Sequence, residues 1–181
     1  MESIEVAEVE TPLGKMQLSV RGGALCTLGW NLPPLPTARA AAPAALELAA
    51  RVTAYFAGNL RAFAGVRFEP AGTDFQHAVW AQLVQIPPGE TRSYGQIAAA
   101  IGKPSASRAV GAANGANPIA VAVPCHRVIG ASGALTGYGS GLPRKRWLLD
   151  HEGANGREQR AQIALFGERV DERDPQVDAR R

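Results

Sequence analysis

The amino-acid sequence predicts an α+β fold of two domains, a small α/β domain followed by a mainly helical one. Residues 1–30 alternate apolar and polar positions, as short strands do. From Thr73 onward the apolar positions follow helical spacing instead. Two short helical segments of that region flank a tight turn containing glycine, which is typical of a helix-turn-helix. We therefore place a supporting domain at 1–72, a second domain at 73–154 and a charged tail at 155–181.

Three strands are expected at the start of the first domain. The first covers residues 4–9 and ends at the turn sequence 11–14, which contains proline and glycine. The second covers 16–20, where every other residue is apolar. The Arg-Gly-Gly turn at 21–23 separates it from a third strand over Ala24–Trp30.

One helix is expected later in this domain, over Ala44–Phe56. Leu48 and Val52 fall on one apolar stripe of that helix, and Gly58 provides a stop signal. The segment Val66–Phe68 is expected to return to the sheet.

Two capping boxes mark helix starts in the second domain. In this motif a hydroxyl and an amide side chain satisfy free N–H groups of the first helical turn. Thr73 with Gln76 fits the motif, and so does Ser93 with Gln96.

Three helices follow from these signals. The first ends before Pro87, the second covers Tyr94–Ile101, and the third covers 105–114. The second and third form the expected helix-turn-helix pair, although such pairs also occur as plain packing units.

A further helix begins near Leu142 and places Glu152 at its C-terminal end, where the helix dipole disfavours an anion. Arg144, Lys145 and Arg146 lie near its start, where cations are disfavoured. Because local rules are broken at both ends, we expect partners supplied from elsewhere in the fold. The alternative is that all four side chains are solvated, at a cost of a few tenths of a kcal/mol each.

Composition indicates a soluble globular protein, with 46% hydrophobic residues in 181 and a net charge of +3. The chain has no run of about 18 apolar residues, so no membrane partner is expected. The acidic start, Met1–Glu5, lacks an apolar signal core, which favours the cytoplasm. Two cysteines make neither a disulfide framework nor a four-thiolate zinc site, so no metal is expected.

The positive charge lies in one part of the sequence. Residues 1–72 hold 6 basic and 6 acidic residues, and 153–181 hold the same numbers. Residues 73–152 hold 7 basic and 4 acidic residues, which accounts for the whole excess. A localised basic surface suits a phosphate backbone, although a chance excess on a solvated face is the alternative.

Cys125 and His126 form the most reactive pair in the chain, just after a turn at Asn117-Pro118. A thiol beside an imidazole can act as a nucleophile with its base, because the thiolate is the reactive form. On the pair alone, an inert buried cysteine is the more common outcome.

The sequence around this pair resembles the methylated-DNA–protein-cysteine methyltransferases, also called O6-alkylguanine alkyltransferases. The resemblance runs from Thr73 to Gly153 and keeps the order and spacing of the family's motifs. The matching segments are Gly89–Ala98, Ser107–Gly111, Asn117-Pro118, Pro124–Val128, Leu135–Tyr138 and Lys145–Leu149.

The resemblance implies a ribonuclease-H-like first domain and a winged helix-turn-helix in the second. It also implies that Cys125 accepts an alkyl group from O6-alkylguanine in DNA, and from O4-alkylthymine. His126 would take the thiol proton through a water, and Glu152 would fix its tautomer. Asn117 would brace the active-site turn, and Tyr94 would protonate guanine N3.

Substrate-binding positions also follow from the resemblance. Tyr138 and Gly139 would line the alkyl pocket, with Val128 and Lys145 beside it. A helix face of small residues would enter the minor groove of double-stranded DNA with little sequence specificity, while Arg108 fills the space of a flipped nucleotide. The remaining residues of this DNA-binding face are Ala106, Ser107, Ala109 and Gly111.

The thioether product implies an irreversible reaction, one molecule per lesion, with no cofactor. We expect a monomer that can bind cooperatively along DNA. The main competing function is a non-catalytic binder of alkylated DNA, and Cys125 disfavours it. A Cys–His hydrolase and a sequence-specific helix-turn-helix regulator are two further candidate functions.

Overall fold

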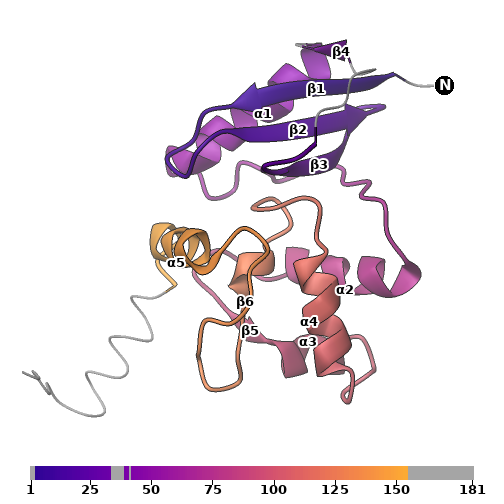
Figure 1. Cartoon of the computed structure of the whole chain (residues 1–181), viewed down its shortest axis with the longest axis vertical. Helices are drawn as coiled ribbons and strands as arrows, with labels where there is room; N and C mark the ends of the chain where they lie inside the picture. The colour runs from indigo at the N-terminus through magenta and orange to yellow at the C-terminus, as the bar shows by residue number, and fades with distance from the viewer. Residues whose placement is uncertain (1–2, 34–38, 41, 155–181) are drawn as a thin grey trace, which may run out of the picture.

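The computed structural model describes residues 3–33, 39–40 and 42–154. Within these residues the fold is mixed α/β, as predicted. A sheet covered by one helix forms the upper part of Figure 1, and a helical part lies beneath it. The predicted tail at 155–181 lies outside the described residues.

The sheet of the upper part contains all three predicted strands. They are β1 (Ile4–Val9), β2 (Met16–Arg21) and β3 (Ala24–Trp30), paired antiparallel in sequence order. A two-residue strand that we did not predict, β4 (Arg39–Ala40), pairs parallel with β1 and completes the order β3-β2-β1-β4.

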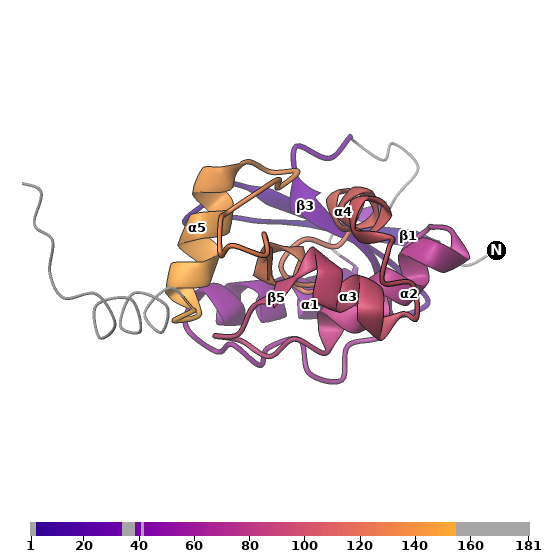
Figure 2. The same ribbon diagram turned by 90° about the horizontal axis from the view of Figure 1, so that it is seen from below.

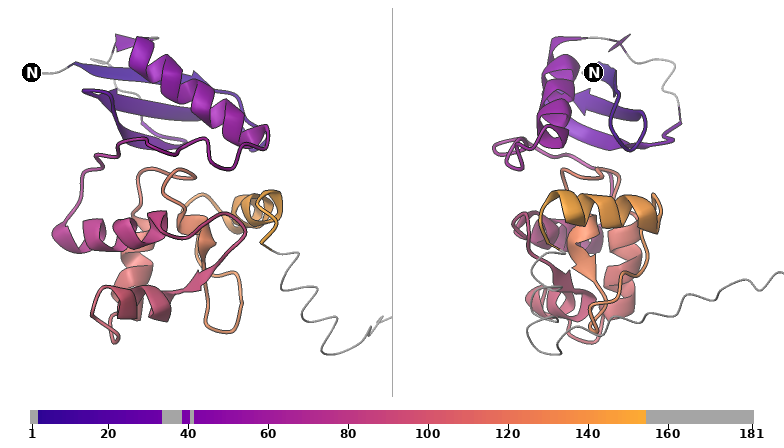
Figure 3. Two further views of the ribbon diagram at one scale, coloured as in Figure 1. Left: turned by 180° about the vertical axis from the view of Figure 1, so that it is seen from behind. Right: turned by 90° about the vertical axis from the view of Figure 1, so that its left-hand side faces the viewer.

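Helix α1 (Pro43–Phe56) packs against this sheet, as the turned view in Figure 3 shows. It begins one residue earlier than predicted, because proline is well tolerated in the first helical turn. Its buried stripe includes Leu48, Val52 and Tyr55. The expected return to the sheet is confirmed as a single bridge between Phe68 and Leu25.

Both capping boxes are confirmed in the helical part. Thr73 accepts from the Gln76 N–H at 3.3 Å, and the Gln76 amide oxygen accepts from the Thr73 N–H at 2.8 Å. Ser93 and Gln96 make the same pair of bonds at 3.2 and 2.7 Å. The boxes open α2 (Asp74–Val84) and α3 (Tyr94–Ala100).

Helix α4 (Ser107–Gly115) starts two residues later than predicted and ends one residue later. The start moves because the Ala106 N–H is used in a turn, where it donates to the Lys103 carbonyl at 2.8 Å. Helices α2, α3 and α4 pack on one another (Figure 2).

The remaining elements surround the 3-10 turn η1 (Cys125–Arg127). Two short strands pair with each other in parallel. One is β5 (Arg92–Ser93), which precedes η1 in the sequence, and the other is β6 (Val128–Ile129), which follows it directly. Helix α5 (Leu142–His151) closes the described chain and lies beneath the C-terminal end of α1 in Figures 1 and 3.

The two parts share a continuous apolar core. The edge of β3 pairs with the segment before η1, because the Leu28 N–H donates to the Pro118 carbonyl at 2.9 Å and Leu28 accepts from Ala120 at 2.7 Å. Leu28 and Ile119 are fully buried members of the same cluster. The domain boundary near residue 73, the ribonuclease-H-like description and the winged helix-turn-helix stay predictions.

None of the helices in the described ranges is long and apolar enough to cross a membrane.

Candidate active site

Asn117 makes three hydrogen bonds within the turn that leads into η1. Its amide nitrogen donates to the carbonyls of Val123 at 2.8 Å and Ile119 at 3.3 Å, and its amide oxygen accepts from the Ile119 N–H at 3.0 Å. Inside this turn Val121 has a φ of 71°, a left-handed conformation that strains a β-branched residue. The side chain of Asn117 therefore holds a strained loop at both ends.

Cys125 opens η1 and is only 5% exposed. Burial raises the pKa of its thiol, while the Asn117 side chain, the positive charge of Lys145 and nearby backbone N–H groups oppose the rise. The net direction is upward, so the resting thiol keeps its proton and needs a base to react.

Asn114 supports the cysteine from α4, a contact that the sequence analysis missed. Its buried amide nitrogen donates to the Cys125 carbonyl at 3.2 Å. The sequence signal that could have pointed to Asn114 is its position three residues before Asn117.

His126 is fully buried, and its Nε2 lies 3.0 Å from Glu152 Oε1. Because a carboxylate only accepts hydrogen bonds, Nε2 carries the proton and Nδ1 keeps a free lone pair. Nδ1 bonds to no protein group in the described ranges. Burial lowers the pKa of His126, with Arg127 and Lys145 adding to the effect and Glu152 opposing it. The ring is therefore neutral and able to accept a proton.

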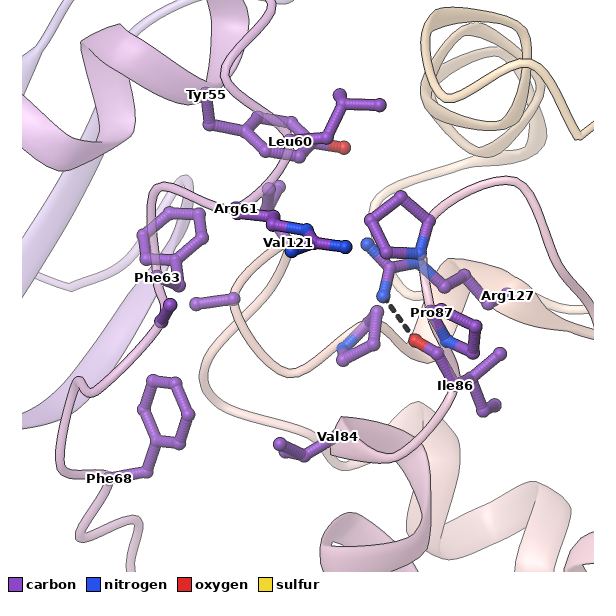
Figure 4. Close-up of a pocket in the computed structure, with 14 residues that line it drawn as sticks. Tyr55, Leu60, Arg61, Phe63, Phe68, Val84, Ile86, Pro87, Val121 and Arg127 are labelled. Carbon is purple, nitrogen blue, oxygen red and sulfur yellow. Dashed lines mark hydrogen bonds between the residues drawn. The ribbon is translucent and has the colours of Figure 1, made fainter.

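Arg127 holds the other side of the Glu152 carboxylate. Its Nε donates to Oε2 and its Nη2 to Oε1, both at 2.7 Å, and its Nη1 donates to the Ile86 carbonyl at 2.5 Å (Figure 4). Burial alone would raise the pKa of Glu152, but the hydrogen bonds from Arg127 and His126 outweigh it and hold this pKa well below its usual range. The sequence analysis placed Arg127 in a matching motif without giving it this role.

A third donor to Glu152 comes from the upper part of the molecule. The hydroxyl of Tyr55, on α1, donates to Glu152 Oε1 at 2.5 Å. This contact could not be predicted from the sequence, because 97 residues separate the partners and no local pattern links them.

The same tyrosine lines a cavity of about 220 Å³ between the two parts of the molecule (Figure 4). Phe63 and Phe68 approach the cavity from one side, and Pro87 and Arg127 approach it from the other. The cavity therefore lies next to two of the side chains that donate hydrogen bonds to Glu152, namely Tyr55 and Arg127.

Lys145 lies fully buried on α5 and holds the loop 130–141. Its ammonium donates to the carbonyls of Val128 at 2.6 Å, Thr136 at 2.8 Å and Gly137 at 3.3 Å. Burial lowers its pKa to about 8, although charge on Cys125 acts in the opposite direction. Lys145 is thus connected to the site by its hydrogen bonds to the loop.

The other predicted substrate-binding residues lie along this loop and strand. Burial raises the pKa of Tyr138 well above its usual value, and a thiolate at Cys125 acts in the same direction, so the Tyr138 hydroxyl stays protonated near the sulfur. A side chain at Gly139 would begin 3.4 Å from the Gly115 carbonyl, so the loop packs closely on the end of α4. Val128 is fully buried in β6. Tyr94 donates from α3 to the Thr136 carbonyl at 3.2 Å.

The predicted DNA-binding residues lie together at the start of α4. Arg108 and Ala109 are exposed, Ser107 and Gly111 are half-buried, and Ala106 is the residue that precedes the helix. A side chain at Gly111 would begin 3.8 Å from the Tyr94 ring, so the glycine marks close contact between α4 and α3.

His151, the second histidine near Glu152, has a different partner. Its Nε2 lies 2.9 Å from the Tyr55 carbonyl, and its ring stacks on Trp147 with centroids 4.9 Å apart. It joins α5 to α1. Within the described residues no group of three or more His, Cys, Asp or Glu side chains could hold a metal ion.

A buried thiol next to a neutral imidazole, which is in turn tied to an ionised carboxylate, is typical of proteins that use a cysteine in covalent chemistry. Residues 74–154 match the family model described as the DNA-binding domain of 6-O-methylguanine DNA methyltransferase. The methylated-DNA–protein-cysteine methyltransferase of Mycobacterium tuberculosis is 50% identical over 153 residues, which are 82% of this chain and 92% of the relative. The chain therefore belongs to the methylated-DNA–protein-cysteine methyltransferases and is an enzyme of that family.

Other relatives agree with this assignment. The enzyme of the same name from Mycolicibacterium paratuberculosis is 47% identical over 175 residues, covering 90% of this chain and 99% of the relative. A crystal structure of Mycobacterium tuberculosis OGT in complex with DNA matches with a TM-score of 0.76 and 47% identity, covering 83% of this chain and 93% of that one.

Proposed function

We propose that this protein repairs DNA by moving an alkyl group from O6 of guanine to the sulfur of Cys125. The Sγ–carbon bond forms as the carbon–O6 bond breaks, and the electron pair of that bond leaves with guanine. The observation that carries the proposal is the adjacency of Cys125 and His126 in η1, with His126 tied to the ionised Glu152 at 3.0 Å.

The thiol proton passes to His126. Its Nδ1 is the available acceptor, because Nε2 donates to Glu152. Adjacent side chains seldom face each other squarely, so a water carries the proton between them. The buried carboxylate then stabilises the imidazolium that forms.

The alkylated guanine lies between the loop 130–141 and the turn that carries Cys125. Tyr138 and Gly139 line the alkyl pocket, Val128 forms its floor, and Lys145 holds the loop in place. Tyr94 gives a proton to guanine N3 as the base leaves, which balances the charge of the departing anion.

Helix α4 docks in the minor groove of double-stranded DNA. The DNA complex of the Mycobacterium tuberculosis relative supports DNA as the partner. The target nucleotide is turned out of the stack, and Arg108 occupies the space that it leaves. The groove presents a degenerate code, so flanking sequence has little effect.

The product thioether is stable, so each molecule acts once and needs no cofactor. O4-alkylthymine presents a similar alkyl–oxygen bond and serves as a second substrate. The protein works in the cytoplasm as a monomer that can bind cooperatively along DNA.

Mass spectrometry of the protein after mixing with an O6-methylguanine oligonucleotide tests the proposal. We expect one added methyl group on the peptide that contains Cys125, and none in Cys125→Ser. A folded, reduced protein that binds the oligonucleotide without gaining a methyl group would instead be a non-catalytic lesion binder.

A further inference from the structure

The carboxylate of Glu152 receives more hydrogen bonds than the family's cysteine, histidine and glutamate relay requires. Oε1 alone accepts from three donors, namely Tyr55 at 2.5 Å, Arg127 at 2.7 Å and His126 at 3.0 Å. The Tyr55 bond is the shortest of the three, and it is the one that comes from the first 72 residues.

Tyr55 is held so that its hydroxyl has little freedom. Its side chain is 1% exposed and packs on the rings of Phe56 and Phe63, with centroids 5.3 and 5.9 Å away. His151, from α5, bonds to its backbone carbonyl at 2.9 Å. Burial and the negative charge of Glu152 raise the pKa of Tyr55 far above neutral pH, so the hydroxyl remains a donor.

The charged groups around His126 come from two elements, η1 and α5. Glu152 at the end of α5 favours the imidazolium, whereas Arg127 in η1 and Lys145 in α5 disfavour it. Around Glu152 the facing groups are Tyr55 from α1, and His126 and Arg127 from η1. The protonation of His126 therefore depends on how much negative charge remains on the shared oxygen Oε1.

We propose that Tyr55 is a positioning residue for alkyl transfer, which sets the strength of the base by donating to the oxygen that His126 also contacts. A hydrogen bond to Oε1 draws charge from the side that faces the imidazole. His126 then stays neutral at a pH where a bare carboxylate would hold it protonated. This inference rests on the proposed function of His126 as the base.

Through Tyr55, the part of the molecule that contains the sheet and α1 takes a role in the reaction. The sheet already contacts the active-site turn where Leu28 bonds to Pro118 and Ala120. Tyr55 adds a contact to the carboxylate end of the same relay. A change in how α1 packs on α5 would thus alter the basicity of His126 as well as the stability of the fold.

Tyr55→Phe tests this role, because it removes one oxygen and keeps the ring. The rate of methyl transfer from an O6-methylguanine oligonucleotide is measured from pH 5 to 9, and the His126 ring is titrated by NMR. We expect the acid limb of the rate profile and the His126 titration to move together to higher pH, by about half a unit or more. At a pH near that limb, the rate falls roughly threefold.

Phe56→Leu is the matched control. Phe56 neighbours Tyr55 and packs on Trp147 in the same contact between α1 and α5, but it has no polar group. We expect it to lower the melting temperature and to leave both titrations where they are in the parent protein. If it moves them as far as Tyr55→Phe does, packing alone sets the base and the proposal is wrong.

Replacing Tyr55 with 3-fluorotyrosine reverses the sign of the effect without removing the hydroxyl. The more acidic phenol donates more strongly, so the acid limb and the His126 titration move to lower pH. This variant also decides the question if Tyr55→Phe does not fold.

Unchanged titrations in a folded Tyr55→Phe and in the fluorotyrosine protein would overturn the inference. That result differs from failure of the proposed function, in which the parent protein itself leaves Cys125 unmodified.

Discussion

Glu152 lies at the end of α5, where the helix dipole opposes its charge, and three side chains compensate for that position. Arg127, His126 and Tyr55 all donate to it.

Two cations at the start of the same helix are also partnered. Lys145 bonds to three carbonyls, and Arg144 bonds to the carbonyls of Leu13 and Ser140. Partners from elsewhere in the fold were predicted for these residues, and the structure confirms them for Glu152, Lys145 and Arg144; Arg146 is exposed.

The buried charge of Glu152 makes stability depend on pH. Its pKa in the folded protein lies below the value of about 4.3 for an unfolded glutamate. Its contribution to the free energy of unfolding is therefore complete above that pH and is lost as the pH falls toward the folded pKa.

We predict that Glu152→Gln lowers the free energy of unfolding by about 3–5 kcal/mol at pH 7, because Arg127 is left buried without its counter-ion. Urea unfolding between pH 7 and 3 measures this. The gap between variant and parent narrows below about pH 4.3. Glu10→Gln, at an exposed carboxylate, serves as the control and follows the parent. A gap that stays constant down to pH 3 would contradict the assignment.

The resemblance to the family implied that Cys125, His126, Glu152 and Asn117 form one site, because its motifs run through this part of the sequence. Tyr55 could not be found in this way. It sits on the apolar stripe of an ordinary amphipathic helix, and only the docking of α1 on α5 brings its hydroxyl to the carboxylate.

At the scale of secondary-structure elements, Lys145 links the loop 130–141 both to α5 and to the strand before the loop. Lys145 bonds to Thr136 and Gly137 within the loop and to Val128 in the strand before it. The position of Tyr138 and Gly139 therefore depends on α5.

We predict that Lys145→Met loosens this loop. Loss of the charge-assisted bonds is worth at least about 1.5 kcal/mol, which is roughly a tenfold increase in loop opening. Hydrogen exchange of residues 130–141 reports the change, and methyl transfer slows with it. Lys103→Met changes the same residue type at an exposed position and leaves the loop protected. Equal exchange in the two variants would show that Lys145 does not hold the loop.

The connection between α2 and β5 also touches the site, through Gly89. This residue has a φ of 80°, and an added Cβ would lie 3.1 Å from the Glu152 carbonyl oxygen. Both its conformation and its surroundings therefore require glycine.

We predict that Gly89→Ala lowers stability by more than the ~1–2 kcal/mol expected for left-handed backbone strain, and slows methyl transfer. Gly133→Ala is the control, because Gly133 has a φ of 84° but nothing within 4 Å of an added Cβ. Thermal melts and transfer rates of the two variants separate strain from crowding. If the two lose the same stability and keep the same rate, the contact with Glu152 has no effect.

The starts of α2 and α3 were predictable because a capping box is a local signal. The two-residue strands β4, β5 and β6 were not, since each exists only through pairing with a distant segment. The positive φ of Val121 could not be predicted either, because a valine is not a sequence signal for the left-handed conformation.

At the scale of the whole molecule, the start of α4, where we propose contact with DNA, lies apart from the sheet. The sheet and α1 lie on one side of the Cys125 turn, and α3 with the start of α4 lies on the other (Figures 1 and 2). Of the cations in residues 73–152, Arg127 and Lys145 are buried in the site, whereas Lys103 and Arg108 are exposed just before and within α4. Contact with a phosphate backbone is therefore expected on the side away from the sheet.

Arg108 allows docking on DNA to be separated from chemistry at Cys125. It is exposed near the start of α4, whereas the relay is buried behind the turn. We predict that Arg108→Ala slows methyl transfer from duplex DNA about tenfold or more, because extruding a base costs a few kcal/mol that the arginine offsets. Transfer from free O6-methylguanine base should be unchanged, since nothing has to be flipped. Arg21→Ala removes one exposed positive charge from β2, in the other part of the molecule, and should affect neither reaction. Equal slowing of both reactions by Arg108→Ala would place the arginine in the chemical step, whereas no slowing with duplex would remove it from base extrusion.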